Sequence, residues 1–434
     1  MIDKSSQFVR SRREFHAALA AAMMIPMIRS LSAASPVPAP ANYDELVSAN
    51  NAFALKLLEE IEKAKPGQNE FFSPFSIHAA LLMALEGARS NTAQEIGTVL
   101  QLAAGKKTSE KGSPWDLTAI RREYAAAAKL FQKTNTPAAE KMRKEIADLR
   151  KQLAAANSSA DSLGRSNKYR EAQKAQMEAE RLANRINQLA PQVDQFELDC
   201  ANSMWVEKTF PLSSVYANNI RQHYGSSEAV AVDFKNDFEK QRARINQWVS
   251  DHTAGKITDI LTPGTIDSLT RFVLANAIYF KGTWSRPFEV SQTKPQTFFG
   301  AGGNEVQIPM MNAWGFEAGK YAAFKADGSN FETPTMVPID FKDEEGYPDK
   351  DGFVAAELPY NGDVLSMLVL LPRSKDGLKK LSASITAEKL AKVSASLQNR
   401  TMHLQLPRFK LDSNYDLRAI LTSLGMPDRL QPSG

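Results

Sequence analysis

The sequence lacks the features that would indicate disulfide bonds, a membrane span or nucleic-acid binding. Its 434 residues include one cysteine, Cys200, so no disulfide can form within the chain. No apolar run reaches the roughly 20 residues that a transmembrane helix needs. The formal net charge is only +4, and no basic stripe is interleaved with aromatic residues. We therefore expect no membrane span once an export signal is removed, and no nucleic-acid partner.

Motifs for catalysis are lacking as well. The chain has no phosphate-binding loop, dinucleotide fingerprint, nucleophile elbow or zinc signature. Its five histidines show no metal-ligand spacing, and we interpret His78 and His252 as helix-surface positions. Cys200 follows an alternating pattern that places it on the apolar side of a strand, so an inert core thiol is favoured over a reactive one. We expect that the protein is not an enzyme and that it binds no metal and no cofactor. An exported hydrolase is the least favoured hypothesis.

The first 34 residues have the composition of an export signal. Arg12 and Arg13 precede an apolar stretch that is followed by small residues. The adjacent arginines resemble the twin-arginine signal of bacteria, although an ordinary secretory signal has similar features. A proline-rich linker is expected over residues 35–45. Both alternatives predict that the mature protein is exported to the periplasm or the extracellular space.

An apolar stretch in the second half of the chain predicts a central strand. From Phe272 to Phe280 the only polar side chain is Asn276, and many of the others are β-branched or aromatic. This pattern is typical of a strand that is buried on both faces. A lone amide in such a strand needs hydrogen-bond partners, because an unpaired one costs about 1–3 kcal/mol. Trp284, just beyond the strand, is expected to be a large packing anchor.

Residues 104–195 differ from the rest of the chain, because they are polar, rich in alanine and strongly helical. Apolar residues recur at steps of three and four from Met142 to Leu153 and again from Ala172 to Leu189. A polar loop is expected between these two helices, over 157–166. The pattern predicts an antiparallel coiled-coil hairpin, which could be a solvated spacer or an arm that binds a partner.

Several short blocks elsewhere occur in a recognisable order. They are Asn69–Ile77, Ala201-Asn202, Ile245–Val249, Thr253–Ile257, Leu274–Trp284, Glu357–Tyr360, Leu406–Phe409 and Leu424–Met426. In this order they resemble the serpins, the family of serine protease inhibitors. The resemblance covers Leu46–Leu102 and Phe196–Gly434, apart from the helical segment and a second insertion near 326–351.

The resemblance implies an α+β fold of three β-sheets surrounded by about nine helices, with residues 46–434 as the serpin-like domain. It also implies suicide inhibition of a serine endopeptidase, or of a cysteine endopeptidase, in which a cleaved reactive loop inserts as a strand beside the central strand. Ser73, Ser76 and Asn276 match the family's polar "shutter", and Trp284 matches its "breach" tryptophan. The expected partner is thus a serine protease, and a monomer is expected.

The family pattern continues for several dozen residues beyond Leu424–Met426, whereas this sequence stops at Gly434. We therefore expect the C-terminal strands and the reactive loop to be absent, and the bacterial inhibitor to be non-functional in this form. The alternative is a non-inhibitory serpin-like protein that binds a partner through the helical hairpin. The target protease and its cleavage site cannot be read from the sequence.

Overall fold

The computed structural model describes residues 44–103, 113–130, 137–166, 168–189, 196–210, 212–224, 227–300, 304–316, 319–330, 336–337, 351–361, 365–411, 413, 415 and 417–426. The predicted export signal, most of the linker and most of the second predicted insertion lie outside these residues. The described residues form three β-sheets and eleven α-helices, and nine helices remain when the two helices of the insertion are set aside.

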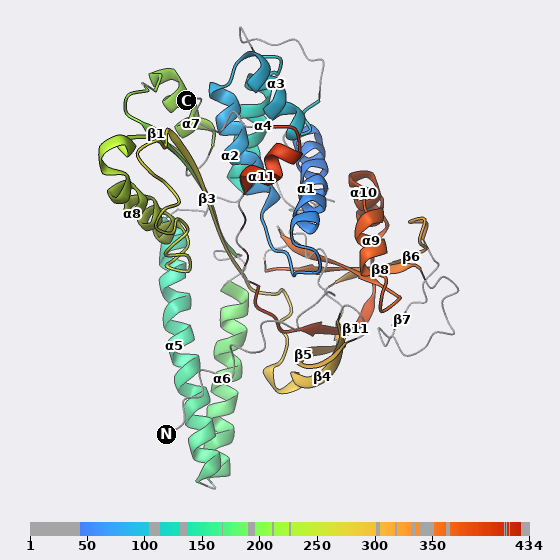
Figure 1. Ribbon diagram of the computed structural model, residues 1–434. Helices are drawn as coiled ribbons and strands as arrows, with labels where there is room; N and C mark the ends of the chain where they lie inside the picture. The colour runs from blue at the N-terminus through green and yellow to red at the C-terminus, as the bar shows by residue number, and fades with distance from the viewer. Residues whose placement is uncertain are drawn as a thin grey trace.

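Four helices form the N-terminal part of the body. They are α1 (Asp44–Ala64), α2 (Pro74–Gly87), α3 (Ser90–Val99) and α4 (Leu117–Leu130). The apolar helix α2 lies between the others and the first sheet, and its residues from Ile77 to Met83 are all buried. The short helix α11 (Leu417–Ser423) packs against α1, although it comes from the other end of the described chain (Figure 1).

The insertion contains two long helices, α5 (Pro137–Arg165) and α6 (Tyr169–Leu189), which pack along each other and extend away from the body (Figure 1). Ile146, Ile186 and Leu189 form a small apolar core between them. The predicted loop at 157–166 is wrong, since α5 continues through it to Arg165. The reason is that the three- and four-residue steps continue there, so that Ala160 is buried in the same seam.

The first sheet has the strand order β2-β1-β3 and two neighbouring helices. Its elements are β1 (Phe196–Glu207), α7 (Ser214–His223), β2 (Glu228–Val232), α8 (Phe234–His252) and β3 (Phe272–Gly282). β1 pairs with β3 in antiparallel register and with β2 in parallel register. On one face Ala275 and Ala277 share a core with apolar residues of α8, while on the other Phe272 and Leu274 pack against the core that includes α2.

β3 is less buried than its sequence predicts. Ala275 and Ala277 are buried, but Phe272, Leu274 and most of the remaining side chains are only partly buried. The physical reason lies in the pairing of the strand. Among the described residues β3 pairs along its length with β1 alone, so side chains beside its other edge stay accessible.

Two further sheets form the rest of the body. The sheet of order β10-β6-β8-β9 consists of β6 (Lys320–Phe324), β8 (Phe353–Pro359), β9 (Ser366–Pro372) and β10 (Gln398–Asn399). The sheet of order β4-β5-β11-β7 consists of β4 (Lys294–Phe299), β5 (Glu305–Phe316), β7 (Met336–Val337) and β11 (Thr401–Pro407). One apolar core joins the two sheets, and a second lies where α9 (Leu378–Ser384) and α10 (Ala387–Ser396) contact β8 and β9. The short 3-10 helix η3 (Val290–Gln292) precedes β4.

Candidate functional site

The first turn of α2 brings one serine against the first sheet. Ser73 is the N-cap, and Pro74 occupies the first helical position, where its missing N–H is not needed. The Ser73 hydroxyl accepts a hydrogen bond from the backbone N–H of Ser76 at 3.3 Å. This cap fixes the start of the helix, and Ser76 on its inner side is fully buried.

The register of the first sheet supplies two amides opposite Ser76. Asn202 of β1 is paired directly with Asn276 of β3. The Asn276 Nδ2 group donates to Asn202 Oδ1 at 2.5 Å and also to the Ser76 hydroxyl. We call Ser76, Asn202 and Asn276 the polar cluster. It connects α2, β1 and β3 at a single point within apolar surroundings.

Of the three predicted shutter residues, the structure therefore joins Ser76 and Asn276 directly, while Ser73 contributes only as the helix cap. Sequence reasoning did not select Asn202 as a site residue. A signal was present, because the dipeptide Ala-Asn occurs in both apolar strands, at 201–202 and at 275–276. Without the antiparallel register, nothing in the sequence shows that the two asparagines meet.

Asn202 also carries an unsatisfied group. Its side chain is completely buried, and its Nδ2 atom has no hydrogen-bond partner among the described residues. A buried donor of this kind is rare in folded proteins, because it loses water without gaining an acceptor. The polar cluster therefore has capacity for one more acceptor.

Trp284 lies just beyond the other end of β3, eight residues past Asn276, a separation of about 26 Å along an extended chain. Its ring stacks on Tyr360 with centroids 4.5 Å apart, and it meets Phe288 edge-on at 6.2 Å. An isolated β-bridge links Trp284 with Tyr360, which follows β8. Burial raises the pKa of the Tyr360 hydroxyl to about 12, so this ring stays neutral. Trp284 thus anchors the end of β3 to the β6–β8 sheet.

The described histidines lie apart from one another. The prediction that His78 occupies a helix surface is wrong, since it is buried between α1 and α3. Its ring meets Phe53 edge-on, and its Nε2 atom lies 3.2 Å from the carbonyl oxygen of Leu100. Burial lowers its pKa to about 4. The sequence pattern did not reveal this burial, because α2 is covered on nearly every side and no face of its middle turns reaches water.

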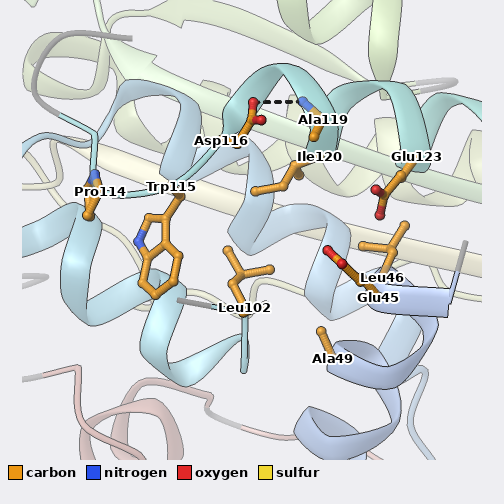
Figure 2. Close-up of a pocket in the computed structure, with 11 residues that line it drawn as sticks. Glu45, Leu46, Ala49, Leu102, Pro114, Trp115, Asp116, Ala119, Ile120 and Glu123 are labelled. Carbon is orange, nitrogen blue, oxygen red and sulfur yellow. Dashed lines mark hydrogen bonds between the residues drawn. The ribbon is translucent and has the colours of Figure 1, made fainter. Parts of the chain in front are cut away.

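A small pocket lies between the first turns of α1, the residues after α3 and the start of α4 (Figure 2). Two of its side chains already form hydrogen bonds within the protein. Asp116 accepts a hydrogen bond from the backbone N–H of Ala119 at 3.0 Å, and Trp115 donates to the carbonyl oxygen of Ala93 at 2.7 Å. The pocket thus reflects the packing of three helices and lies apart from the polar cluster.

Among the described residues no group of three His, Cys, Asp or Glu side chains could hold a metal ion. In the same part of the chain no helix is long and apolar enough to cross a bilayer. Cys200 is half-buried on β1.

Comparison with known proteins places these features in a family. Residues 48–433 match the family described as "Serpin (serine protease inhibitor)". Human Serpin B3 is 31% identical over 389 residues, which cover 89% of this chain and 78% of that protein. Mouse leukocyte elastase inhibitor A is 28% identical over 396 residues, with coverage of 90% and 79%.

Solved structures show the same fold. Emu ovalbumin superposes with a TM-score of 0.63 at 24% identity and covers 88% of this chain, which spans 78% of that structure. A complex of thyroxine-binding globulin with thyroxine gives a TM-score of 0.58 at 22% identity, with coverage of 87% and 77%.

The family match extends to residue 433 and the relatives named here are animal proteins, so neither the expected loss of C-terminal strands nor the expected bacterial source is supported.

Proposed function

The chain belongs to the serpin family, and from that membership we propose that it inhibits an endopeptidase by accepting an inserted strand beside β3. The family is one of protease inhibitors, so the protein is not an enzyme, and human Serpin B3 and the mouse elastase inhibitor are related members. The suicide route and the class of protease are the parts that we propose.

The observation that carries the proposal is the state of β3. The strand is joined to β1 on one side, and no other described strand pairs along its second edge. Unpaired N–H and C=O groups on such an edge favour the addition of another strand. Asn276 of the polar cluster lies on the same strand, and its side chain joins that strand to α2 and to β1.

In the proposed reaction the protease attacks the carbonyl carbon of a bond in an exposed loop of the inhibitor. The peptide bond breaks, the amine of the downstream segment leaves, and an ester joins the protease to the upstream segment. That segment then inserts next to β3 and carries the protease with it before water can cleave the ester. Strand pairing and burial supply the driving force, because the open edge becomes a paired one.

Purified native protein is the material for the test. We would incubate it with trypsin-, chymotrypsin- and subtilisin-like proteases and separate the products in SDS. A covalent complex should form, and it should be missing with the same proteases after chemical blocking of their active-site serine. The proposal fails if the native protein is cut, or left intact, by all three classes without a complex.

A second candidate function uses α5 and α6 as a contact surface. The pair extends from the body (Figure 1), and Tyr169 and Met177 on α6 are 71% and 64% exposed although they are large and apolar. A solved complex of thyroxine-binding globulin with thyroxine has the same fold, so this fold also serves binding. A photo-crosslinking residue at position 177 should then give one discrete adduct, and one at the exposed position 151 should not.

We also propose that the protein is exported through the twin-arginine route. The support is the order of Arg12, Arg13 and the apolar stretch in the sequence. Residues 1–45 fused to a reporter that works only outside the cytoplasm should give signal, and replacing both arginines by lysine should abolish it. Unchanged export of the double-lysine fusion would rule out this route. The monomeric state stays a prediction.

A further inference from the structure

A buried ion pair holds the C-terminal end of α2. Arg121 of α4 donates from Nε and Nη2 to the two carboxylate oxygens of Glu86, at 2.8 and 2.5 Å. The two side chains are only 13% and 1% exposed. The Tyr224 hydroxyl, at the end of α7, donates to the same carboxylate at 2.8 Å. This geometry fixes both the distance and the rotation between α2 and α4, because a two-pronged arginine contact has a defined plane.

A stack of three rings leads from this ion pair to the N-terminal end of α2. Tyr224 stacks on Tyr124 of α4 with centroids 5.1 Å apart. Tyr124 in turn stacks on Phe75 with centroids 5.3 Å apart and an angle of 11° between the ring planes. Phe75 is the neighbour of Ser76, which accepts the hydrogen bond from Asn276. The two ends of α2 are therefore held by one continuous set of contacts.

We call Phe75, Glu86, Arg121, Tyr124 and Tyr224 the α2 clamp. Replacing a buried ion pair by apolar residues is often neutral or favourable for stability, so such a pair is weak evidence for stabilisation. What a bidentate pair does supply is orientation. In this chain the oriented element is α2, which carries Ser76 of the polar cluster.

We propose that the α2 clamp positions Ser76 against Asn276 and thereby controls how readily the open edge of β3 accepts a strand. The inference rests on the proposed function for its consequence, since the clamp regulates the strand insertion that inhibition requires. Arg121 and Glu86 are positioning residues, because they act on β3 through α2.

The clamp also connects the helical insertion to the polar cluster. α4 carries Arg121 and Tyr124, and it is the last described helix before α5. β1 carries Asn202, and it is the first described strand after α6. Both ends of the insertion therefore lead into elements that hold α2 and β3 together.

Hydrogen exchange in the isolated full chain tests the clamp without any protease, so its outcome is independent of whether inhibition is observed. We would compare exchange in segments 73–80, 272–282 and 353–372 for the wild type and three variants. Arg121→Met breaks the pair, and Glu86→Leu with Arg121→Met removes both charges and so leaves none unpaired. Lys320→Met is the matched control, since Lys320 forms a partly buried ion pair with Glu357 at 3.2 Å in the β6–β8 sheet.

Both clamp variants should exchange about tenfold faster than wild type in segments 73–80 and 272–282, with little change in 353–372. The control should show the reverse pattern. Equal acceleration in all three segments would overturn the proposal, because the pair would then contribute only general stability. Unchanged exchange in segment 272–282 would overturn it too. If Arg121→Met does not fold, the same comparison is made with the double variant alone.

Discussion

The polar cluster and the α5–α6 pair are stabilised in opposite ways. The cluster joins three elements through a few hydrogen bonds from one side chain, Asn276, in otherwise apolar surroundings. The helical pair repeats one kind of apolar contact along its length, with Ile146 and Ile186 among several equivalent positions. Each contact in the pair is one of many, whereas each bond in the cluster has no substitute.

This difference shows where the molecule can change and where it cannot. A repeated seam tolerates the loss of one contact, because its neighbours keep the register. A buried polar cluster does not, since removing one partner leaves the others desolvated and unpaired. All five tryptophans, at 115, 205, 248, 284 and 314, lie outside α5 and α6. Tryptophan fluorescence therefore reports on the body alone, while far-ultraviolet circular dichroism also reports on the pair.

Asn276→Ala should have the largest effect on the body. It removes both hydrogen bonds of the Nδ2 group and leaves Ser76 and Asn202 with buried polar atoms, at a cost of about 2–4 kcal/mol. Denaturant unfolding followed by tryptophan fluorescence should show this loss. Asn184→Ala on the exposed side of α6 is the control, and it should stay within about 0.5 kcal/mol of wild type. Similar losses of stability in both variants would mean that the hydrogen bonds of Asn276 contribute no more than an exposed asparagine does.

Acid should weaken the body through His78 on α2. Burial lowers the pKa of His78 to about 4, below the ordinary value of 6.5, so in this window the unfolded chain binds a proton that the folded chain excludes. The free energy of unfolding should therefore fall as the pH drops from about 6.5 to 4, by up to about 3 kcal/mol. His78→Gln, which can still donate to the Leu100 carbonyl oxygen, should lose less stability over this range. Parallel pH profiles for the two proteins would contradict this account.

Removal of residues 137–190 should change the body only slightly. The apolar side chains of α5 and α6 pack mainly on each other, and the core formed by Ile146, Ile186 and Leu189 is separate from the cores of the body. A short flexible linker across the gap should shift the fluorescence midpoint by a few degrees at most, roughly the effect of 1 kcal/mol. Aggregation or loss of the cooperative transition would show that the pair packs on the body.

Ile186→Ala should leave the body unchanged while it loosens the pair. Ile186 is 8% exposed, and truncation of a buried isoleucine costs about 2–5 kcal/mol. We expect an earlier loss of helical circular dichroism and the same fluorescence midpoint as wild type. A fluorescence midpoint that falls with the helical signal would mean that the two regions unfold as one unit.

Much of this architecture follows from the sequence. The cap at Ser73 and Pro74, the strand at Phe272–Phe280 and the heptad steps of the insertion each predict a local element, and the structure has a helix or strand at each place. These features depend on neighbours in the chain, which is why the residue order reveals them. The roles given to Ser76, Asn276 and Trp284 came from a family resemblance, and the proposed function depends on it.

Other features were decided only in three dimensions. The segment expected to be a loop at 157–166 is helical and Ala160 within it is buried, and His78 is buried because α1 and α3 both cover α2. Asn202 and Asn276 are 74 residues apart in the sequence and meet through the strand register. Glu86 and Arg121 are 35 residues apart and form an ion pair. Local patterns encode which face of an element is apolar, but not which distant element covers that face. That choice depends on the packing of the whole chain, and the polar cluster and the α2 clamp exist only as its result.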